Sequence, residues 1–175
     1  MVTLIESPHA EVRFGHALRW LSTQPSSRPL LVLAPTLDAG SSLLRAATKL
    51  RGAVFGWAME SLGSLAVRLC ALRLAEQRLT LAPPLALEAV CVRVVSELQA
   101  QRKLGRLGPI ADRPGLPGAL LRTFSELGQA AVEAQAVPGE LGELYQHYQR
   151  TLAGLKLTDR AGLFRLARCL SLTQR

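Results

Sequence analysis

Apolar residues in the first sixty positions alternate between short continuous runs and helical spacing. The runs have the length of strands, and the segments between them place apolar residues on one side of a helix. This pattern predicts strands over Val2–Ile5, Leu30–Ala34 and Ala53–Trp57, and helices over Ala10–Leu21 and Ser41–Leu50. Alternating strands and helices favour a parallel sheet, so we expect three parallel strands flanked by two helices. The middle run is bounded by prolines and apolar throughout, which indicates a strand buried on both faces.

Beyond residue 61 helical spacing takes over. It predicts helices over Leu62–Leu79, Pro83–Lys103, Ala119–Val132, Glu140–Leu155 and Thr158–Leu170. Thr158 is expected to cap the last of these helices. The first is expected to bury one stripe, made of Leu62, Leu65, Ala66, Leu69 and Leu72. The fold class is therefore predicted to be α/β, with a small parallel sheet in residues 1–60 and an all-helical lobe in residues 61–175.

Composition supports a folded protein outside the membrane. About half of the 175 residues are hydrophobic (49%), which is enough to build a core. No apolar run approaches the roughly 18 residues that span a bilayer, and the N-terminus lacks the features of a secretion signal. The cysteines Cys70, Cys91 and Cys169 are far apart and lie in apolar helical patterns. We therefore expect buried thiols, a cytoplasmic location and no membrane partner.

The chain carries a formal net charge of +8, with arginine supplying 18 of its 21 basic residues. Such a charge suits a polyanionic partner. The arginines are scattered, however, and a bias toward arginine, alanine and leucine is also what a GC-rich genome produces. A nucleic-acid contact and a merely solvated basic surface both fit this composition.

No catalytic or metal-binding constellation is visible in the sequence. His9, His16 and His147 have no partner at metal-ligand spacing. Glu140 and Glu143 share a helix face but have no matching pair of acids. The serines at positions 7, 61 and 64 do not lie in a nucleophile-elbow sequence. We therefore expect no catalytic residue, no metal and no cofactor in this chain.

Three segments, in their order and spacing, resemble motifs of superfamily 1 DNA helicases. Leu31–Gly40 is similar to the motif in which a strand ends in a threonine-containing turn that touches single-stranded DNA. Ser61–Leu69 is similar to the next motif, a Thr-Phe-His-Ser-Leu pattern that leads into a helix. Leu157–Ala167 resembles the stretch that closes the helical insertion before the Walker B strand. The run Gly108–Gly115 and the helix after it resemble AddB-type subunits of bacterial helicase–nuclease complexes, within the RecB-like PD-(D/E)XK nucleases.

This resemblance implies a partial P-loop helicase-like core at the start of a longer DNA repair and recombination nuclease. It implies two partners, which are single-stranded DNA bound without sequence preference and a helicase subunit. Thr36 and Ser61 are the expected DNA contacts because each follows a strand at the carboxyl edge of the sheet, where such folds bind ligands. Arg45 and Arg68, on the following helices, are expected to add charge. A module that docks a helicase subunit without touching DNA is the alternative.

The phosphate-binding loop departs from the helicase pattern. In a P-loop, glycines let backbone N–H groups cradle phosphates, a lysine reaches the terminal phosphates and a hydroxyl holds magnesium. Here Val12 stands in place of the lysine and Arg13 in place of the serine or threonine. Glu11 replaces a glycine, and Pro8 after Ser7 removes a backbone donor. The motor function is therefore expected to be lost.

The base-stacking aromatic residues of the helicase motifs are also replaced. Leu37 and Leu62 stand in their positions. Leucine offers a base less contact area and no π-stacking, and an aromatic contributes about 1–3 kcal/mol per stacked base. Any DNA contact at these motifs is therefore expected to be mainly electrostatic.

The altered loop predicts that the chain does not bind ATP. Calorimetric titration with Mg·ATP is expected to give no heat beyond that of dilution, because Glu11 repels the phosphates and no lysine attracts them. A dissociation constant in the micromolar range or below would contradict this reading of the loop.

Overall fold

A computed structural model describes residues 3–25 and 27–173 of the chain. The chain divides into two compact units, residues 1–65 and residues 66–175. The sequence placed the boundary between residues 60 and 61. Each unit is described below by itself.

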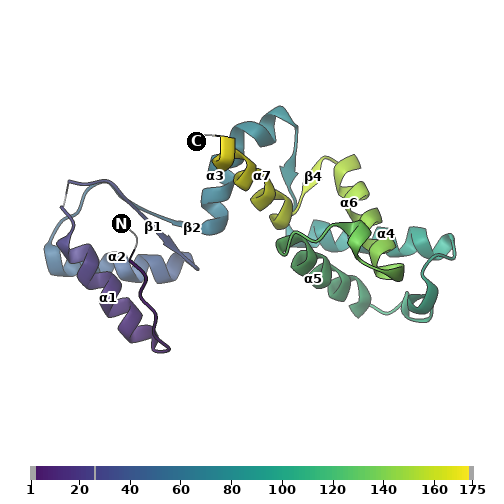
Figure 1. The fold of residues 1–175 in the computed structure, drawn as a ribbon, viewed down its shortest axis with the longest axis horizontal. Helices are drawn as coiled ribbons and strands as arrows, with labels where there is room; N and C mark the ends of the chain where they lie inside the picture. Colours follow the sequence, from purple (N-terminus) through teal and green to yellow (C-terminus); the bar gives the residue numbers. More distant parts are fainter. Residues whose placement is uncertain (1–2, 26, 174–175) are drawn as a thin grey trace. The chain divides into compact units, whose positions relative to one another are not determined.

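The first unit combines two helices with a two-stranded parallel sheet (Figure 1). Its elements are α1 (Ala10–Thr23), β1 (Leu30–Ala34), α2 (Leu37–Arg51) and β2 (Trp57–Ser61), followed by the start of α3 (Leu62–Glu76). The two strands pair in register from Leu30 opposite Trp57 to Ala34 opposite Ser61. Both strands therefore end together, and α2 connects them as the crossover that parallel pairing requires.

The expectation of three strands is wrong for the described residues. Residues 3–9 contain no strand, and Val2 lies outside the described residues. Thr3 and Ile5 instead line a hollow of about 320 Å³ together with Ala17 and Trp20 of α1. The segment is therefore held beside a helix and not hydrogen-bonded into the sheet.

The last strand of this unit begins where the sequence expected it to end, at Trp57. Gly52 and Gly56 both have positive φ angles, 84° and 72°, a conformation that interrupts an extended run. The amide of Leu30 donates a hydrogen bond to the carbonyl oxygen of Gly56, and regular pairing starts with the next residue. Backbone geometry at these glycines, and not the apolar run 53–57, sets where the strand starts.

Only one face of β1 is covered. Leu31 and Leu33 are 44% and 46% exposed, whereas Leu30, Val32 and Ala34 are partly buried. Helix α2 packs on the strands and α1 packs on α2. The predicted burial of both faces is therefore wrong. The apolar run could not show that α1 would pack on α2 and leave the other face of the strands without a helix in the described part of the unit.

Helix α2 approaches the sheet closely because Gly40 has no side chain. A Cβ atom at Gly40 would lie 2.1 Å from the Sδ atom of Met59 on β2. At the other end of α2, the Arg51 guanidinium donates to the carbonyl oxygens of Leu21 and Gln24 and lies 5.9 Å from the ring centre of Trp57. These contacts fix α2 against both α1 and β2.

The second unit is mostly helical. It contains the remainder of α3, followed by β3 (Thr80–Leu81), α4 (Pro84–Ala100), the 3-10 helix η1 (Gly105–Ile110), α5 (Gly115–Gln129), the 3-10 helix η2 (Ala134–Ala136), α6 (Gly139–Gly154), β4 (Leu157–Thr158) and α7 (Arg160–Thr173). The short strands β3 and β4 form a parallel pair. They correct the expectation of an all-helical lobe, since two residues are too few to give a periodic signal.

The main core of this unit lies among α4, α5 and α6. Phe124 is fully buried, with its ring centre 5.2 Å from that of Tyr145 and 4.9 Å from that of Tyr148. Helices α4 and α6 supply most of this core, whose buried members include Val90, Val94, Leu98, Leu144 and Leu152. Burial raises the pKa of the Cys91 thiol to about 12, so this thiol stays protonated and inert.

A polar contact also connects α4 to α6. His147 Nε2 lies 2.8 Å from Glu97 Oε2, and Arg93 donates a hydrogen bond to Glu97 Oε1 at 2.7 Å. The hydrogen bonds from Arg93 and His147 hold the pKa of Glu97 below its usual value. Glu97 therefore stays ionised at the edge of the core.

Of the stripe predicted for α3, only Ala66 is fully buried. Its buried residues are Ala66, Cys70 and Leu74, which pack with Leu163 of α7. The predicted inward leucines Leu62, Leu69 and Leu72 are instead 56%, 57% and 72% exposed. The prediction followed the largest side chains, whereas α7 packs on the small ones; Cys70 Sγ lies 3.8 Å from the carbonyl oxygen of Leu163.

The cap of α7 is also one residue later than predicted. Asp159 Oδ1 accepts a hydrogen bond from the Gly162 amide at 2.7 Å, and Asp159 Oδ2 accepts one from the Tyr148 hydroxyl at 3.3 Å. Thr158 is buried and belongs to β4. Asp159 therefore caps the N-terminus of α7 and connects it to Tyr148 of the aromatic core.

Replacing Gly40 by alanine is expected to lower the free energy of unfolding by about 0.5–2 kcal/mol, because overlap of the added methyl group with the Met59 side chain outweighs the gain from alanine in a helix. Gly15→Ala is the matched control. Gly15 lies inside α1 with nothing within 4 Å of an added Cβ atom, so alanine there is expected to stabilise by about 0.5–1 kcal/mol. Urea unfolding followed by circular dichroism measures both. Equal effects of the two substitutions would contradict the close approach of α2 to β2.

Candidate nucleic-acid interface

Thr36 and Ser61 lie at the same edge of the two-stranded sheet. Ser61 is the last residue of β2 and pairs with Ala34, the last residue of β1. Thr36 follows Ala34 by two residues. The parallel register therefore brings both predicted contacts to the carboxyl end of the strands, where ligands of open α/β sheets bind.

Thr36 is the N-cap of α2. Its backbone is extended (φ −132°, ψ 155°), and its Oγ1 atom accepts a hydrogen bond from the Ala39 amide at 3.2 Å. The side chain is exposed, so the hydroxyl proton remains available to donate to an acceptor such as a phosphate oxygen. Asp38 in the first turn of the same helix places a negative charge nearby, which weakens the attraction for an anion.

Ser61 is occupied by a reciprocal cap at the start of α3. The Ser61 amide donates to Ser64 Oγ at 2.9 Å, and the Ser64 amide donates to Ser61 Oγ at 3.1 Å. Ser64 Oγ also lies 3.0 Å from both the Ser61 carbonyl oxygen and Ser61 Oγ. This arrangement is a capping box built from two serines. Ser61 therefore positions the helix together with Ser64, which the sequence had not indicated as a capping residue.

The two predicted arginines are placed differently. Arg45 is exposed on α2, nine residues after Thr36, which separates their backbones by about 13 Å along the helix. Arg68 is exposed on α3 and belongs to the second unit. The structure thus brings Thr36 and Ser61 to one edge of the sheet, whereas Arg45 lies further along the surface of α2.

Ser7, His9 and Arg13, in the segment that was compared with a P-loop by resemblance, form hydrogen bonds with one another. The Ser7 hydroxyl oxygen accepts a hydrogen bond from the His9 amide at 3.2 Å, and the Arg13 guanidinium donates to the Ser7 carbonyl oxygen. Glu11 lies in the first turn of α1 and Val12 is 45% exposed. The carboxylate of Glu11 occupies the end of the helix dipole that an anion would otherwise use.

Part of this edge could have been read from the sequence. Ser61 and Ser64 have the i, i+3 spacing of a capping box before an apolar run, although the second position usually holds Glu or Gln. Asp38 stands two residues after Thr36, so its opposing charge was visible too. The register that places Thr36 beside Ser61 depends on strand pairing and needed the structure.

Residues 3–25 and 27–173 contain no group of three or more His, Cys, Asp or Glu side chains arranged to hold a metal ion. In the same part of the chain, every helix is too short or too polar to cross a membrane. No protein-family model matches the sequence, and no curated protein matches it. The interface is therefore interpreted from its own geometry.

The cap geometry predicts which substitutions of Thr36 destabilise the protein and which do not. Thr36→Ala removes the hydrogen bond to Ala39 and is expected to lower the free energy of unfolding by about 0.5–2 kcal/mol. Thr36→Asp and Thr36→Ser keep a capping oxygen and are expected to leave stability unchanged or slightly raised. Thermal unfolding measures the series. An aspartate variant that is as unstable as the alanine variant would show that Thr36 does not cap α2.

Proposed function

We propose that this chain is a non-motor, helicase-like scaffold region of a DNA repair and recombination nuclease, and that the carboxyl edge of its sheet contacts single-stranded DNA. The observation that carries the proposal is the pairing of β1 with β2, which sets Thr36 beside the end of β2. Hydroxyls and amides at such an edge position a phosphate backbone without reading bases. The net charge of +8 adds a general attraction for polyanions.

The contact is expected to be weak. Leu37 and Leu62 replace the stacking aromatics and are each 56% exposed, so little stacking energy is available. Asp38 opposes the phosphate, and Arg45 stands well along α2. We therefore expect affinities no tighter than the roughly 10⁻⁴ to 10⁻⁶ M of non-specific binding at physiological salt. The proposed role is to guide a single strand of DNA toward a nuclease in a cytoplasmic complex.

Docking of a helicase subunit is the second candidate function. It is favoured by exposed apolar side chains on regular elements, namely Leu31 and Leu33 on β1 and Leu69 and Leu72 on α3. Parallel strands are rarely left with one face in water, so a partner that covers Leu31 and Leu33 would complete the packing of this unit.

Fluorescence anisotropy with a labelled single-stranded oligonucleotide tests the first function. Thr36→Asp keeps the cap but places a carboxylate where a phosphate would sit, so it is expected to weaken binding several-fold and at least as much at low salt as at high salt. Thr48→Asp is the matched control, because it makes the same charge change near the opposite end of α2 and is expected to have little effect.

Equal binding by the wild type and Thr36→Asp would remove this edge from the DNA site. If no variant binds DNA even at low salt, while Leu31→Lys with Leu33→Lys abolishes a salt-insensitive association with a helicase subunit, docking is the function. Apolar interfaces depend little on salt, whereas phosphate contacts depend on it steeply.

A further inference from the structure

Four basic residues lie close together in sequence in the connection between α4 and α5. Arg102, Lys103, Arg106 and Arg113 lie within twelve residues that contain one acid, Asp112. All four basic side chains are exposed, and that of Arg106 is 92% exposed. We call these four residues the basic corner.

The backbone of the basic corner is anchored to the core of the second unit. Arg102 has a φ of 57°, which turns the chain at the end of α4, and the Lys103 amide donates to the Leu98 carbonyl oxygen at 2.9 Å. Leu104 and Ala111 are buried, 2% and 8% exposed, in the core among α4, α5 and α6. The four cations are therefore presented by a packed segment, which reduces the conformational entropy lost when they bind a ligand.

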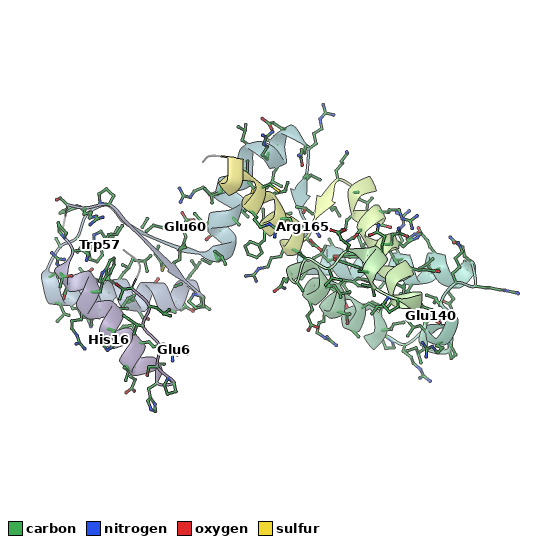
Figure 2. All side chains as sticks on the ribbon, in the orientation of Figure 1. Glu6, His16, Trp57, Glu60, Glu140 and Arg165 are labelled. Atoms are coloured by element: carbon green, nitrogen blue, oxygen red, sulfur yellow. The ribbon has the colours of Figure 1, made fainter. Side chains whose placement is uncertain are left out.

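Glu140, labelled in Figure 2, holds the middle of this segment from α6. Its Oε1 atom accepts a hydrogen bond from the Arg106 amide at 3.2 Å, and backbone hydrogen bonds from its own amide and that of Arg106 hold its pKa below the usual value. Gly105 has a φ of 48°, and a Cβ atom there would lie 2.2 Å from Glu140 Oε1. Glu140 is thus used to fix the backbone.

The two acids near the corner, Asp112 and Glu140, leave half of its formal positive charge uncompensated. Asp112 Oδ1 lies 3.5 Å from Gln99 Nε2, and Glu140 Oε1 is 3.9 Å from Arg106 Nε. Within residues 3–25 and 27–173, Arg102, Lys103 and Arg113 form no ion pair. Arg73 and Arg93, by contrast, are each paired with a glutamate on their own helix.

We propose that the basic corner is a binding surface for the phosphodiester backbone of nucleic acid, carried by the helical unit. Sequence-independent phosphate binding requires cations on a surface and little else. A stable protein interface also requires an apolar core that excludes water, and Ile110, 43% exposed, is the one large apolar side chain exposed in residues 102–113. The inference rests on the proposed function in that nucleic acid is the ligand, but it uses neither Thr36 nor the sheet edge.

The test replaces Arg102, Lys103 and Arg113 by glutamine in the full chain. The matched control replaces Arg78, Lys156 and Arg150, which are equally exposed and remove the same charge. Arg78 and Lys156 also have positive φ angles, 55° and 56°, so the control carries the backbone cost of changing Arg102. Circular dichroism is used to check that both triple variants are folded.

Binding to single-stranded and to duplex oligonucleotides is measured by anisotropy across a salt series. Loss of three phosphate contacts is expected to reduce the slope of log Kobs against log salt by about 2 for single-stranded DNA, and to weaken binding at low salt by about tenfold or more. The control triple variant is expected to change affinity less than about twofold. The arm with the larger loss identifies whether the corner takes a single strand or a duplex.

Equal losses in the two triple variants would overturn the inference, because net charge alone would then explain binding. Unchanged binding by the corner variant would also overturn it. A corner variant that loses binding to phosphatidylserine vesicles but not to oligonucleotides would assign the surface to a membrane instead. If Thr36→Asp has no effect while the corner variant binds weakly, the sheet-edge proposal fails and this inference stands. If Thr36→Asp weakens binding while the corner variant binds as the wild type does, this inference fails and the sheet-edge proposal stands.

Discussion

The packing of Phe124 against Tyr145 and Tyr148 is the contact on which the helical unit depends. It joins α5 to α6 at the centre of the core, with α4 completing the three-helix arrangement. The hydroxyl of Tyr148 then reaches Asp159, whose other carboxylate oxygen caps α7. Burial and the charge of Asp159 raise the pKa of Tyr148, so this hydroxyl remains a donor. One aromatic cluster therefore fixes both the core and the start of the last helix.

The same packing gives the unit its rigid surfaces. Because α4 and α6 are held together, the Glu140 carboxylate on α6 reaches the amide of Arg106 after the end of α4. That contact needs a glycine at position 105, where the chain has no room for a side chain. Core packing therefore fixes the backbone of the basic corner through the Glu140 carboxylate, although the charged side chains of the corner are exposed to water.

The first unit depends on a different constraint. Two parallel strands need a crossover connection between them and a helix that packs on their apolar face. Helix α2 supplies both on one face, and Gly40 lets it approach Met59 closely. The other face keeps Leu31 and Leu33 exposed. The exposure of Leu31 and Leu33 follows from this asymmetry, because no helix in the described part of the unit packs on that face of β1.

The sequence by itself determined the local elements and the charge. Helical spacing predicted α1, α4, α5 and α6, because a long amphipathic period is set by residues close in the chain. The sequence also showed the excess of basic over acidic residues, 21 against 13.

Only the tertiary structure decided which surfaces are buried and which residues meet. Helix α3 buries Ala66, Cys70 and Leu74 against α7 and leaves Leu62, Leu69 and Leu72 exposed. The pairing of β3 with β4 joins residues far apart in the sequence, and two-residue strands leave no periodic signal. Arg102 and Arg113 lie at the two ends of the connection between α4 and α5, and the buried side chains of Leu104 and Ala111 hold that connection against the core. Burial and long-range pairing are properties of the whole fold, and a local pattern carries no information about the partner that each face will find.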